Sequence, residues 1–441
     1  MIPLPEAFKN EIATMLGAEA PAFFAAMEDA PTLALRLNPL RAGAEAAARA
    51  YCGAVVPWEP LGRYLLPDVK PGASIAHAAG AFYLQEASAM LSVAALDPKP
   101  GERILDLCAA PGGKSTQIAG RMAGRGLLVA NEIEPARAKA LASNLERLGA
   151  RNAVVVNARP DALAARLSEY FDALLCDAPC SGEGMFRREP AARAAWQSAS
   201  PAGCARRQAE ILDSAAALLR PGGRLVYSTC TFNRTENEQT IAAFLARHPE
   251  FAPEDFALDG LGSSNGGMLR IWPQRVPGDG HFCARLRKAG DRRTPDPSFP
   301  RPDRETANAL ARLKDEICAL PDGLDARLLR LGDAIFATPA ACPELNGLRV
   351  VSLGTSLARL GRSHIEPQHA LAMTLEPKLA RQSVELADAD ATRYLLGEAI
   401  ACDEGARGWT LMCWQGLPLG WAKASGGWYK NHLPKGLRRN K

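Results

Sequence analysis

The sequence lacks the features of membrane-spanning and exported proteins. No run approaches the roughly 18 uncharged apolar residues that a membrane-spanning helix needs. The first residues, MIPLPEAFKNEIATMLG, contain no basic segment followed by an apolar run, so we expect no secretory signal. From these two absences we expect a cytoplasmic location and no membrane partner.

Metal-binding patterns and an excess of one charge are also missing. The 11 cysteines include no C-x-x-C pair and the six histidines are scattered, so we expect free thiols and no metal. Lys and Arg total 52 against 48 Asp and Glu, and the net charge of only +4 excludes a strongly basic or acidic disordered chain. The thiols therefore serve either in core packing or in chemistry.

The length and the distribution of proline divide the chain. A chain of 441 residues predicts two to four domains, at roughly 100–200 residues per domain. Residues 289–304 contain four prolines among charged residues, a composition typical of a linker. We therefore expect a small N-terminal α+β domain, a central domain, the linker and two C-terminal domains, over residues 1–77, 78–288, 289–304, 305–372 and 373–441.

Short apolar runs alternate with helix-like segments through the central domain. This alternation predicts an α/β domain with a parallel sheet. Ligands of such sheets bind beyond the carboxyl ends of the strands, so the loops after the runs should carry the chemistry. We expect strands over 103–107, 127–130, 153–156, 172–177 and 224–229, and helices over 82–96, 135–148, 160–168, 204–219 and 235–247.

The loop after the first run reads DLCAAPGGKST, from Asp106 to Thr116. Its two glycines let the backbone approach a ligand, and the following helix N-terminus offers unpaired amides. The end of the loop resembles a nucleotide-triphosphate phosphate loop. That pattern requires glycine where this chain has Cys108, and Pro111 removes one amide, so a triphosphatase is disfavoured.

An acidic residue follows the second run. Glu132 lies about 20 residues beyond the glycine loop, where a carboxylate accepts hydrogen bonds from ribose hydroxyls. The same residue could simply stabilise a helix N-terminus, but the glycine loop before it favours a ligand. NAD and S-adenosylmethionine both carry such a ribose, and the absence of G-x-G-x-x-G disfavours NAD.

Two thiols stand at strand ends. Cys180 follows the fourth run and Cys230 ends the fifth, so both should face the same crevice. A buried cysteine is more often a small packing residue than a nucleophile, and we interpret most of the other cysteines in that way. The positions of Cys180 and Cys230 favour chemistry instead.

Three segments now identify a family. LDLCAAPGGKS, DAPCSGEGMFR and YSTCTFNRTENE, in this order and spacing, resemble the signature loops of the Sun-type RNA cytosine-C5 methyltransferases. RIWPQRVPGDGHF and the C-terminal GWAKASGGWYKNHLPKGLR extend the resemblance to the bacterial RsmF-like subgroup, which methylates small-subunit ribosomal RNA. The resemblance implies a Rossmann-like methyltransferase domain, an N-terminal RNA-contacting domain and a PUA-like RNA-binding domain, with S-adenosylmethionine as cofactor.

The family pattern assigns roles to the loops. Cys230 is implied as the nucleophile that adds to cytosine carbon 6, and Cys180 as the group that assists breakdown of the adduct. Asp177 is implied beside the base as a hydrogen-bond partner of ring nitrogen 3. One alternative stays open, because DNA cytosine-C5 methyltransferases use a Pro-Cys nucleophile, which here would be Cys180. The implied cofactor contacts are Cys108, Ala109, Ala110, Pro111, Gly112, Gly113, Lys114, Glu132, Asn157 and Asp177.

Two stretches are less regular. The family usually has an acidic or amide contact to the adenine after the third strand, and here Asn157 is our candidate, with Asp161 as the alternative. Beyond Cys180, the side chain of Phe186 could stack on an RNA base, while Arg187 and Arg188 could contact phosphates.

The C-terminal 21 residues contain no acidic residue. Basic residues interleaved with aromatics are typical of nucleic-acid binding, so we expect contact with ribosomal RNA or the small ribosomal subunit, by a monomer. Transfer RNA as substrate, or a non-catalytic ribosome-assembly role, are the alternatives. The residues concerned are Lys423, Lys430, Lys435, Arg438, Arg439 and Lys441, with Trp421, Trp428 and Tyr429.

Overall fold

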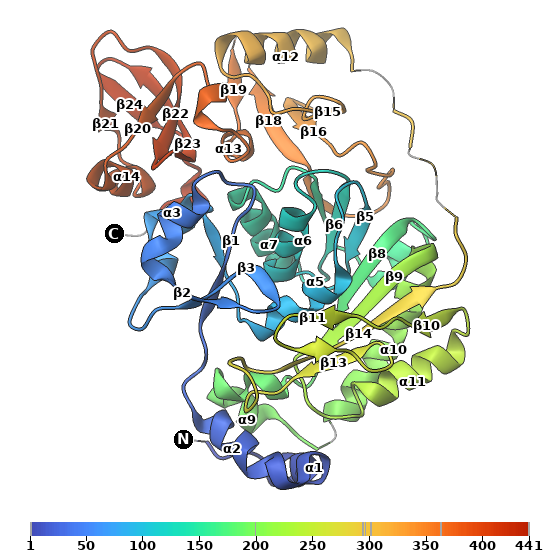
Figure 1. Ribbon diagram of the computed structural model, residues 1–441. Coiled ribbons are helices and arrows are strands. Elements are labelled where there is room, and N and C mark those ends of the chain that lie inside the picture. Colours follow the sequence, from blue (N-terminus) through green and yellow to red (C-terminus); the bar gives the residue numbers. More distant parts are fainter. Residues whose placement is uncertain are drawn as a thin grey trace.

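The predicted alternation builds a twisted sheet in the middle of the molecule (Figure 1). This computed structural model describes residues 2–198, 200–292, 295, 297–299, 302–361 and 364–439. The strand order is β10-β14-β9-β8-β5-β6-β7-β17, with β13 beside β14. The strands are β5 (Arg103–Asp106), β6 (Leu127–Asn131), β7 (Ala153–Val156), β8 (Phe171–Asp177), β9 (Leu219–Thr229), β10 (Phe251–Pro253), β13 (Met268–Ile271), β14 (His281–Lys288) and β17 (Val350–Leu353).

The pairing pattern places the ligand-binding crevice. Strands β5 to β9 are mutually parallel, while β14 and β17 run antiparallel at the two flanks. Successive strands are added on one side of β5 as β6 and β7, and then on its other side as β8 and β9. The loops after β5 and β8 therefore lead away to opposite sides. The crevice that opens where the strand order reverses in this way is the usual ligand site of a parallel sheet.

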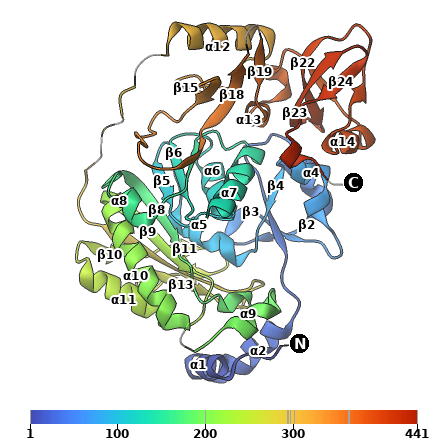
Figure 2. The same cartoon turned by 180° about the vertical axis from the view of Figure 1, so that it is seen from behind.

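Alternating side chains of the buried strands cover both faces of the sheet. Leu105 and Leu174 pack with α8, α10 and α11, whereas Ile104 and Leu175 pack with α5, α6 and α7. Figure 2 shows these two groups of helices on opposite sides of the sheet. The helices are α5 (Leu91–Leu96), α6 (Gly113–Arg121), α7 (Pro135–Arg147), α8 (Pro160–Ala164), α9 (Pro190–Ala195), α10 (Ser200–Leu218) and α11 (Glu238–Arg247), with a small hairpin of β11 (Ala257–Leu258) and β12 (Gly262–Ser263).

One predicted helix is wrong. Residues 82–96 do not form a single helix, because Phe82–Leu84 is strand β4 and only Leu91–Leu96 is α-helical. Phe82 pairs with Leu37 of the N-terminal sheet, so a long-range partner decided the conformation of that stretch. The apolar run alone could not distinguish a strand from a buried helix. The five predicted strands are confirmed.

A first antiparallel sheet precedes the central one. Its order is β2-β3-β1-β4, and helices α1 and α2 pack away from it, on an aromatic cluster that includes Phe186, Phe232 and Trp272. Figure 1 shows these two helices at the opposite end of the molecule from the C-terminal part. The elements are α1 (Glu6–Leu16), α2 (Ala20–Glu28), β1 (Ala34–Leu37), α3 (Ala44–Ala48), β2 (Cys52–Val56), β3 (Glu59–Leu65) and α4 (Ile75–Ala78).

The C-terminal part forms two further sheets, both attached to what precedes them. The first, β15-β16-β18-β19, sends β17 across to the edge of the central sheet, where Val350 lies opposite Val156. The second, β20-β22-β23-β24-β21, shares a core with the N-terminal sheet, in which Tyr394 and Met412 pack with Leu35 and Phe82. The elements are α12 (Arg304–Glu316), β15 (Leu328–Leu331), β16 (Ala334–Ala337), β18 (Thr355–Leu360), β19 (Ile365–Pro367), α13 (His369–Ala372), β20 (Ser383–Glu385), α14 (Asp388–Leu395), β21 (Ile400–Ala401), β22 (Gly408–Trp414), β23 (Leu417–Ser425) and β24 (Trp428–Asn431).

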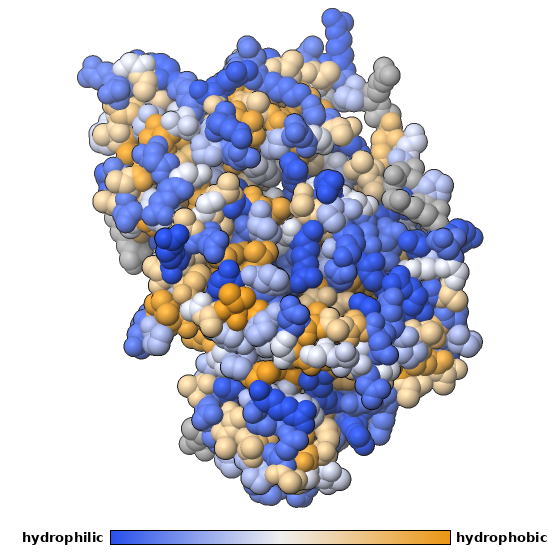
Figure 3. All heavy atoms as spheres, in the orientation of Figure 1, coloured by the Kyte–Doolittle hydropathy of each residue, from blue (hydrophilic) through white to orange (hydrophobic). Residues whose placement is uncertain are grey.

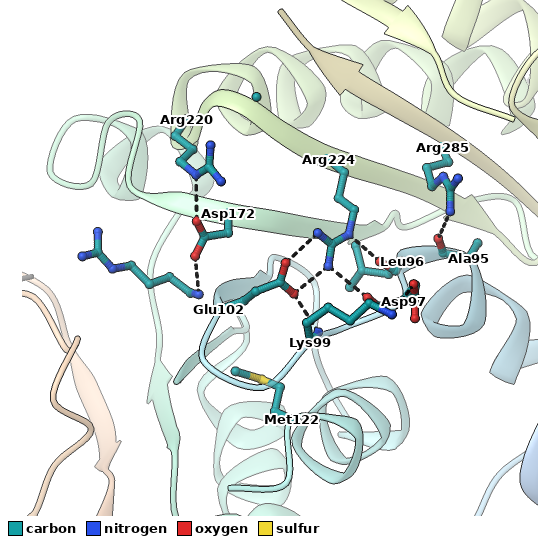
Figure 4. A network of polar contacts seen from close by, with 12 residues as sticks. Ala95, Leu96, Asp97, Lys99, Glu102, Met122, Asp172, Arg220, Arg224 and Arg285 are labelled. Atoms are coloured by element: carbon teal, nitrogen blue, oxygen red, sulfur yellow. Dashed lines mark hydrogen bonds and ion pairs between the residues drawn. The ribbon is translucent and has the colours of Figure 1, made fainter. Parts of the chain in front are cut away.

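An ionic network fixes the amino-terminal ends of the central strands (Figure 4). Arg224 of β9 donates to both carboxylate oxygens of Glu102, at 2.6 Å each, and to the carbonyls of Leu96 and Asp97. A bidentate arginine–carboxylate pair combines charge with fixed geometry. The network therefore joins β9 to the segment between α5 and β5, at the amino-terminal ends of the strands and away from the ligand crevice.

In the part of the chain that the structure describes, no helix is long and apolar enough to cross a membrane. The domain boundaries that we expect from the sequence stay predictions. Residues 293–294, 296 and 300–301 of the expected linker lie outside the described residues, and α12 begins at Arg304.

Candidate active site

The glycine loop connects β5 to α6 at the crevice. Gly112 has a φ of 113°, a left-handed conformation that favours glycine, and an added Cβ there would lie 3.2 Å from the Leu141 side chain. Below the loop, Ser115 Oγ donates a 2.6 Å hydrogen bond to Asp106 Oδ2. Burial raises the pKa of Asp106 to about 7, against the opposing effect of that hydrogen bond.

An arginine from the N-terminal sheet braces this loop. Arg36 is buried and donates to the carbonyl of Gly113 at 2.9 Å and to Thr116 Oγ1 at 2.7 Å. The first turn of α6 is thereby fixed from a separate sheet. Arg36 was not predicted to belong to the site, and Asp106 was expected only as the first residue of the loop. Arg36 precedes the loop by 77 residues, and no local motif connects the two.

Glu132 follows β6 directly, as predicted, and is nearly buried. Its carboxylate accepts from the backbone amide of Glu134 at 2.9 Å and pairs with Arg137 at 3.2 Å. Asn157 follows β7, and its amide nitrogen donates to the carbonyls of Glu132 and Ile133. Asp161 is instead largely exposed and paired with Arg159. The structure thus brings Asn157, and not Asp161, to the loop after β6.

Asp177, at the end of β8, is surrounded by groups that hold its charge. Lys114 Nζ lies 2.7 Å from Oδ2, Ser228 Oγ donates to Oδ1 at 2.7 Å, and His281 Nε2 lies 3.5 Å from Oδ1. Burial by itself would raise the pKa of Asp177, but Lys114 and His281 outweigh it and keep that pKa well below its usual range. Asp177 is therefore a carboxylate throughout the neutral pH range.

The two predicted thiols meet. The Sγ atoms of Cys180 and Cys230 are 3.4 Å apart, because their parent strands are parallel neighbours with Asp177 opposite Ser228. The contact with Cys230, burial and the nearby Glu236 carboxylate raise the pKa of the Cys180 thiol well above its ordinary value. Cys230 instead interacts with the Lys114 ammonium, whose pKa is raised by Asp177 and Cys230 against the effect of burial. Of the two sulfurs, Cys230 is therefore the one next to an ammonium group, and Cys180 the one whose neutral thiol form is favoured.

Two buried glutamates join the cysteine loops reciprocally. Glu183, from the Cys180 loop, accepts from the backbone amides of Phe232 and Asn233 at 2.8 and 3.0 Å. Glu236, from the Cys230 loop, accepts from the backbone amide of Ser181 at 3.0 Å. The side-chain amide of Asn233 donates to both carboxylates. Hydrogen bonds from backbone amides to these two carboxyl groups therefore hold the loops of the two thiols together.

Comparison with known proteins assigns this site to a family. The family model described as 16S rRNA methyltransferase RsmB/F matches residues 93–287. Models for the RsmF N-terminal domain, first C-terminal domain and PUA domain match residues 4–87, 313–375 and 381–439. Ribosomal RNA small subunit methyltransferase F of Shewanella loihica is 36% identical to the chain over 88% of its length and 84% of the relative. The chain belongs to the RsmF family.

Other relatives and structures agree with this RsmF assignment. The protein of the same name from Cronobacter sakazakii is 34% identical over 99% of this chain and 97% of its own. The crystal structure of a methyltransferase homolog protein from Pyrococcus horikoshii has a TM-score of 0.56 at 28% identity, covering 65% of this chain and 96% of that one. NSun6 from the same organism, crystallised with SFG, has a TM-score of 0.57 at 21% identity, over 65% and 99% of the two chains, and shows the shared fold. The Rossmann-like domain, the N-terminal domain and the PUA-like domain are thus confirmed.

S-adenosylmethionine, the predicted cofactor, is the methyl donor of the RsmF family. The crevice suits it chemically. Asp106 Oδ1 is buried beneath the glycine loop with no hydrogen-bond partner among the described residues, and a ligand with an ammonium group supplies a donor for it. Gly112 and Gly113 carry no side chain at the loop, and Glu132 places a carboxylate at the next strand end. No group of three or more metal-ligating side chains occurs in the described ranges.

The reciprocal glutamates lead to a first prediction. We expect Glu236→Gln to weaken the bond from the Ser181 amide and to lower the free energy of unfolding by about 1–2 kcal/mol, since hydrogen bonds to charged groups are the stronger ones. The kcat should fall about tenfold because the thiols lose their fixed separation. Affinity for S-adenosylmethionine, measured by calorimetry, should stay unchanged. The exposed Glu250→Gln is the control, and an unchanged kcat for Glu236→Gln would contradict the proposed clamp.

The predicted stacking of Phe186 on an RNA base is wrong, whereas the predicted phosphate contacts of Arg187 and Arg188 stay predictions. Phe186 is fully buried and packs against Phe8, with ring centroids 5.1 Å apart, so it cannot stack on RNA. Arg187 donates to the carbonyls of Ala30 and Gly278, and Arg188 pairs with Asp279. Helices α1 and α2 supply the apolar partners of this loop, and the sequence contained no signal of that packing. The Phe186 ring is therefore part of the protein core, and both arginines are held by contacts within the protein.

The C-terminal tail divides into core and surface. Trp421 is 1% exposed and donates to the Gln368 carbonyl, so it is a core residue and not an RNA contact. Lys423 and Lys430 lie directly opposite each other on β23 and β24, and Trp428 beside them is 48% exposed. Arg439 is directed inward and donates to the Ser74 carbonyl. Lys441 lies outside the described residues.

Proposed function

We propose that this chain methylates carbon 5 of a cytosine in small-subunit ribosomal RNA, through a covalent adduct between Cys230 and the base. The observation that supports the proposal most directly is the pair of thiols, 3.4 Å apart, beside the ion pair of Asp177 and Lys114. One thiol can add to the ring while the other retains a proton. A mere structural use of cysteine would not need such a polar, charged setting.

The residues divide the reaction between them. The Cys230 thiolate attacks carbon 6, and the ring electrons make carbon 5 nucleophilic. As charge builds up on the ring, nitrogen 3 takes a proton from water, and the Asp177 carboxylate accepts the hydrogen bond from that N–H. The cofactor supplies the methyl group to carbon 5. A base takes the carbon 5 proton, nitrogen 3 returns its proton to water, and the double bond between carbons 5 and 6 re-forms as the Cys230 thiolate leaves.

Cys180 is suited to the release step. Its raised pKa keeps it a thiol at neutral pH, so its S–H can hydrogen-bond to the departing Cys230 sulfur, or transfer its proton to that sulfur and itself become the thiolate. Glu132 and Asn157 would hold the adenosine end of the cofactor, and residues 108–114 its methionine end. Lys114 connects the two halves, because it belongs to the cofactor loop and pairs with the residue beside the base.

Bisulfite sequencing of total RNA, from cells with and without the gene, tests the proposed function. We expect one or more 5-methylcytosines of small-subunit ribosomal RNA to be lost in the deletion and restored by the wild-type gene. Loss of a site in transfer RNA instead would reassign the substrate. If no site is lost, the proposed cytosine chemistry is wrong and a non-catalytic ribosome-assembly role replaces it.

The exposed lysines of β23 and β24 give a second prediction. We expect Lys423→Ala/Lys430→Ala to weaken RNA binding and to reduce the slope of log affinity against log salt by about 1.4, at roughly 0.7 per phosphate contact of single-stranded RNA. Fluorescence anisotropy at several salt concentrations measures both. The control is Lys378→Ala, which is 75% exposed and pairs with Glu376. Point substitutions are preferable to deletion, because the C-terminal sheet shares its core with the N-terminal one.

A further inference from the structure

A mostly apolar cavity of about 360 Å³ lies beside the catalytic loops and has no part in the reaction above. It is bounded by the start of β1, the end of β4, the loop after β3 and the end of the Cys180 loop. The residues that matter here are Leu33, Lys70, Leu84, Gln85, Glu86 and Arg188. Its size falls within the range of roughly 300–1,000 Å³ of small-molecule sites.

Two chains of contacts connect this cavity to the reaction centre. On one wall, Gln85 contacts Arg36, which holds the Gly113 carbonyl of the cofactor loop. On the other, Arg188 pairs with Asp279, two residues before His281, and His281 lies 3.5 Å from Asp177. The cavity therefore lies between the cofactor loop and the Cys180 loop, on the side of the N-terminal sheet.

The walls of the cavity expose apolar surface to solvent. Leu33 is 53% exposed and Leu84 is 37% exposed, an unusual concentration next to a polar active site. Figure 3 shows hydrophobic residues at the surface over the N-terminal sheet. A single exposed leucine needs no explanation, but two leucines that line one cavity offer an apolar contact surface to a ligand.

The charges at the rim favour an anionic ligand. Lys70 is exposed, and no carboxylate of the described residues pairs with it. Glu86 would oppose an anion, but its two oxygens accept from the backbone amides of Ala89 and Asp279 and so are directed into the protein. The apolar side chains can contact a nucleotide base, while the unpaired Lys70 ammonium group can bind the phosphate attached to that nucleotide.

We propose that this cavity binds an unpaired base of the RNA strand adjacent to the target cytosine, with Lys70 on the neighbouring phosphate. The inference rests on the proposed function, because it requires an RNA substrate. A cytosine that reaches these partly buried thiols must leave its stack, and its neighbours then lose a stacking partner. Leu33 and Leu84 replace that lost contact, and the flipped-out strand is held open at the mouth of the site.

A matched pair of double variants tests the cavity. Leu33→Ser/Leu84→Ser alters the cavity. Leu329→Ser/Leu331→Ser is the control, because Leu329 and Leu331 of the distant β15 are 37% and 54% exposed and so match Leu84 and Leu33. With S-adenosylhomocysteine present, we expect affinity for a small-subunit ribosomal RNA transcript to fall about tenfold in the first and less than twofold in the second. Equal affinities of the two variants would overturn the proposal.

A crosslinking experiment on the wild-type protein does not depend on the folding of any variant. The same transcript, carrying 4-thiouridine, is irradiated in the complex and the crosslinked peptides are identified. We expect crosslinks within residues 65–73 or 82–86, and their absence from both segments would overturn the proposal. Crosslinks in these segments without methylation would support RNA binding in the cavity and contradict the proposed reaction. Methylation without these crosslinks would support the proposed reaction and contradict RNA binding in the cavity.

Discussion

A Cys230→Ala variant should form no covalent complex with RNA that contains 5-fluorocytosine, whereas a Cys180→Ala variant should form one and retain it. Fluorine at carbon 5 cannot leave as a proton does, so the adduct of an active nucleophile is trapped. We expect kcat on ordinary RNA to fall by roughly 10⁴-fold or more without Cys230, as for other nucleophiles. Without Cys180 the adduct should accumulate even on ordinary RNA. Denaturing gel electrophoresis detects both complexes.

The physical basis of this assignment is the unequal setting of the two sulfurs. Cys180 faces Cys230 and the Glu236 carboxylate, which raise its pKa, while Cys230 interacts with the Lys114 ammonium. Cys402→Ala, a half-exposed cysteine of the C-terminal sheet, is the control and should behave as wild type. An adduct formed by Cys230→Ala but not by Cys180→Ala would reverse the roles and make the Pro-Cys thiol the nucleophile.

Asp177→Asn should lower kcat by about 10²–10³-fold and weaken the affinity for S-adenosylmethionine by a smaller factor, because Asp177 is only one of the expected cofactor contacts. Asparagine keeps the shape of the side chain but cannot offer a full negative charge to the N–H that develops on the ring. Quench-flow methylation assays and calorimetry with the cofactor measure the two quantities separately. Ser228→Ala removes only one hydrogen bond to the carboxylate and should cost less than tenfold.

A second effect of Asp177→Asn is structural and can be separated from the first. Lys114 would lose its partner in a partly buried pair, and we expect the free energy of unfolding to fall by a few kcal/mol. In the double variant Lys114→Met/Asp177→Asn no unpaired charge remains, so stability should recover while kcat stays low. Recovery of kcat together with stability would mean that Asp177 acts only as a structural partner of Lys114.

The strands and the loops after them were predictable because their signals are local. A buried parallel strand is a short apolar run, and RILDL and DALLCD each carry an aspartate at or next to the end of the run, where the loop begins. Cys180, Cys230, Asp177 and Glu132 therefore lay where a parallel sheet must place them. The helix predicted over 82–96 was wrong for the opposite reason, since β4 exists only through its pairing with β1.

Phe186 shows the limit of reading a loop by its composition. Among GMFRR the aromatic and the two arginines indicated RNA contact, yet helices α1 and α2 bury the ring and backbone carbonyls bind the guanidinium groups. Trp421 was misread in the same way. The partners of these side chains come from distant parts of the chain, so residue type and local order could not show whether they face solvent.

The sequence alone determined the order of the strands' loops, the residue types in them and, through these, the family. Only the tertiary structure decided that the two sulfurs stand 3.4 Å apart, that Arg36 braces the cofactor loop and that His281 completes the surroundings of Asp177. The reason is that a motif specifies which groups follow a strand. Distances between groups depend on which strands become neighbours, and that is set by burial of apolar faces along the whole chain.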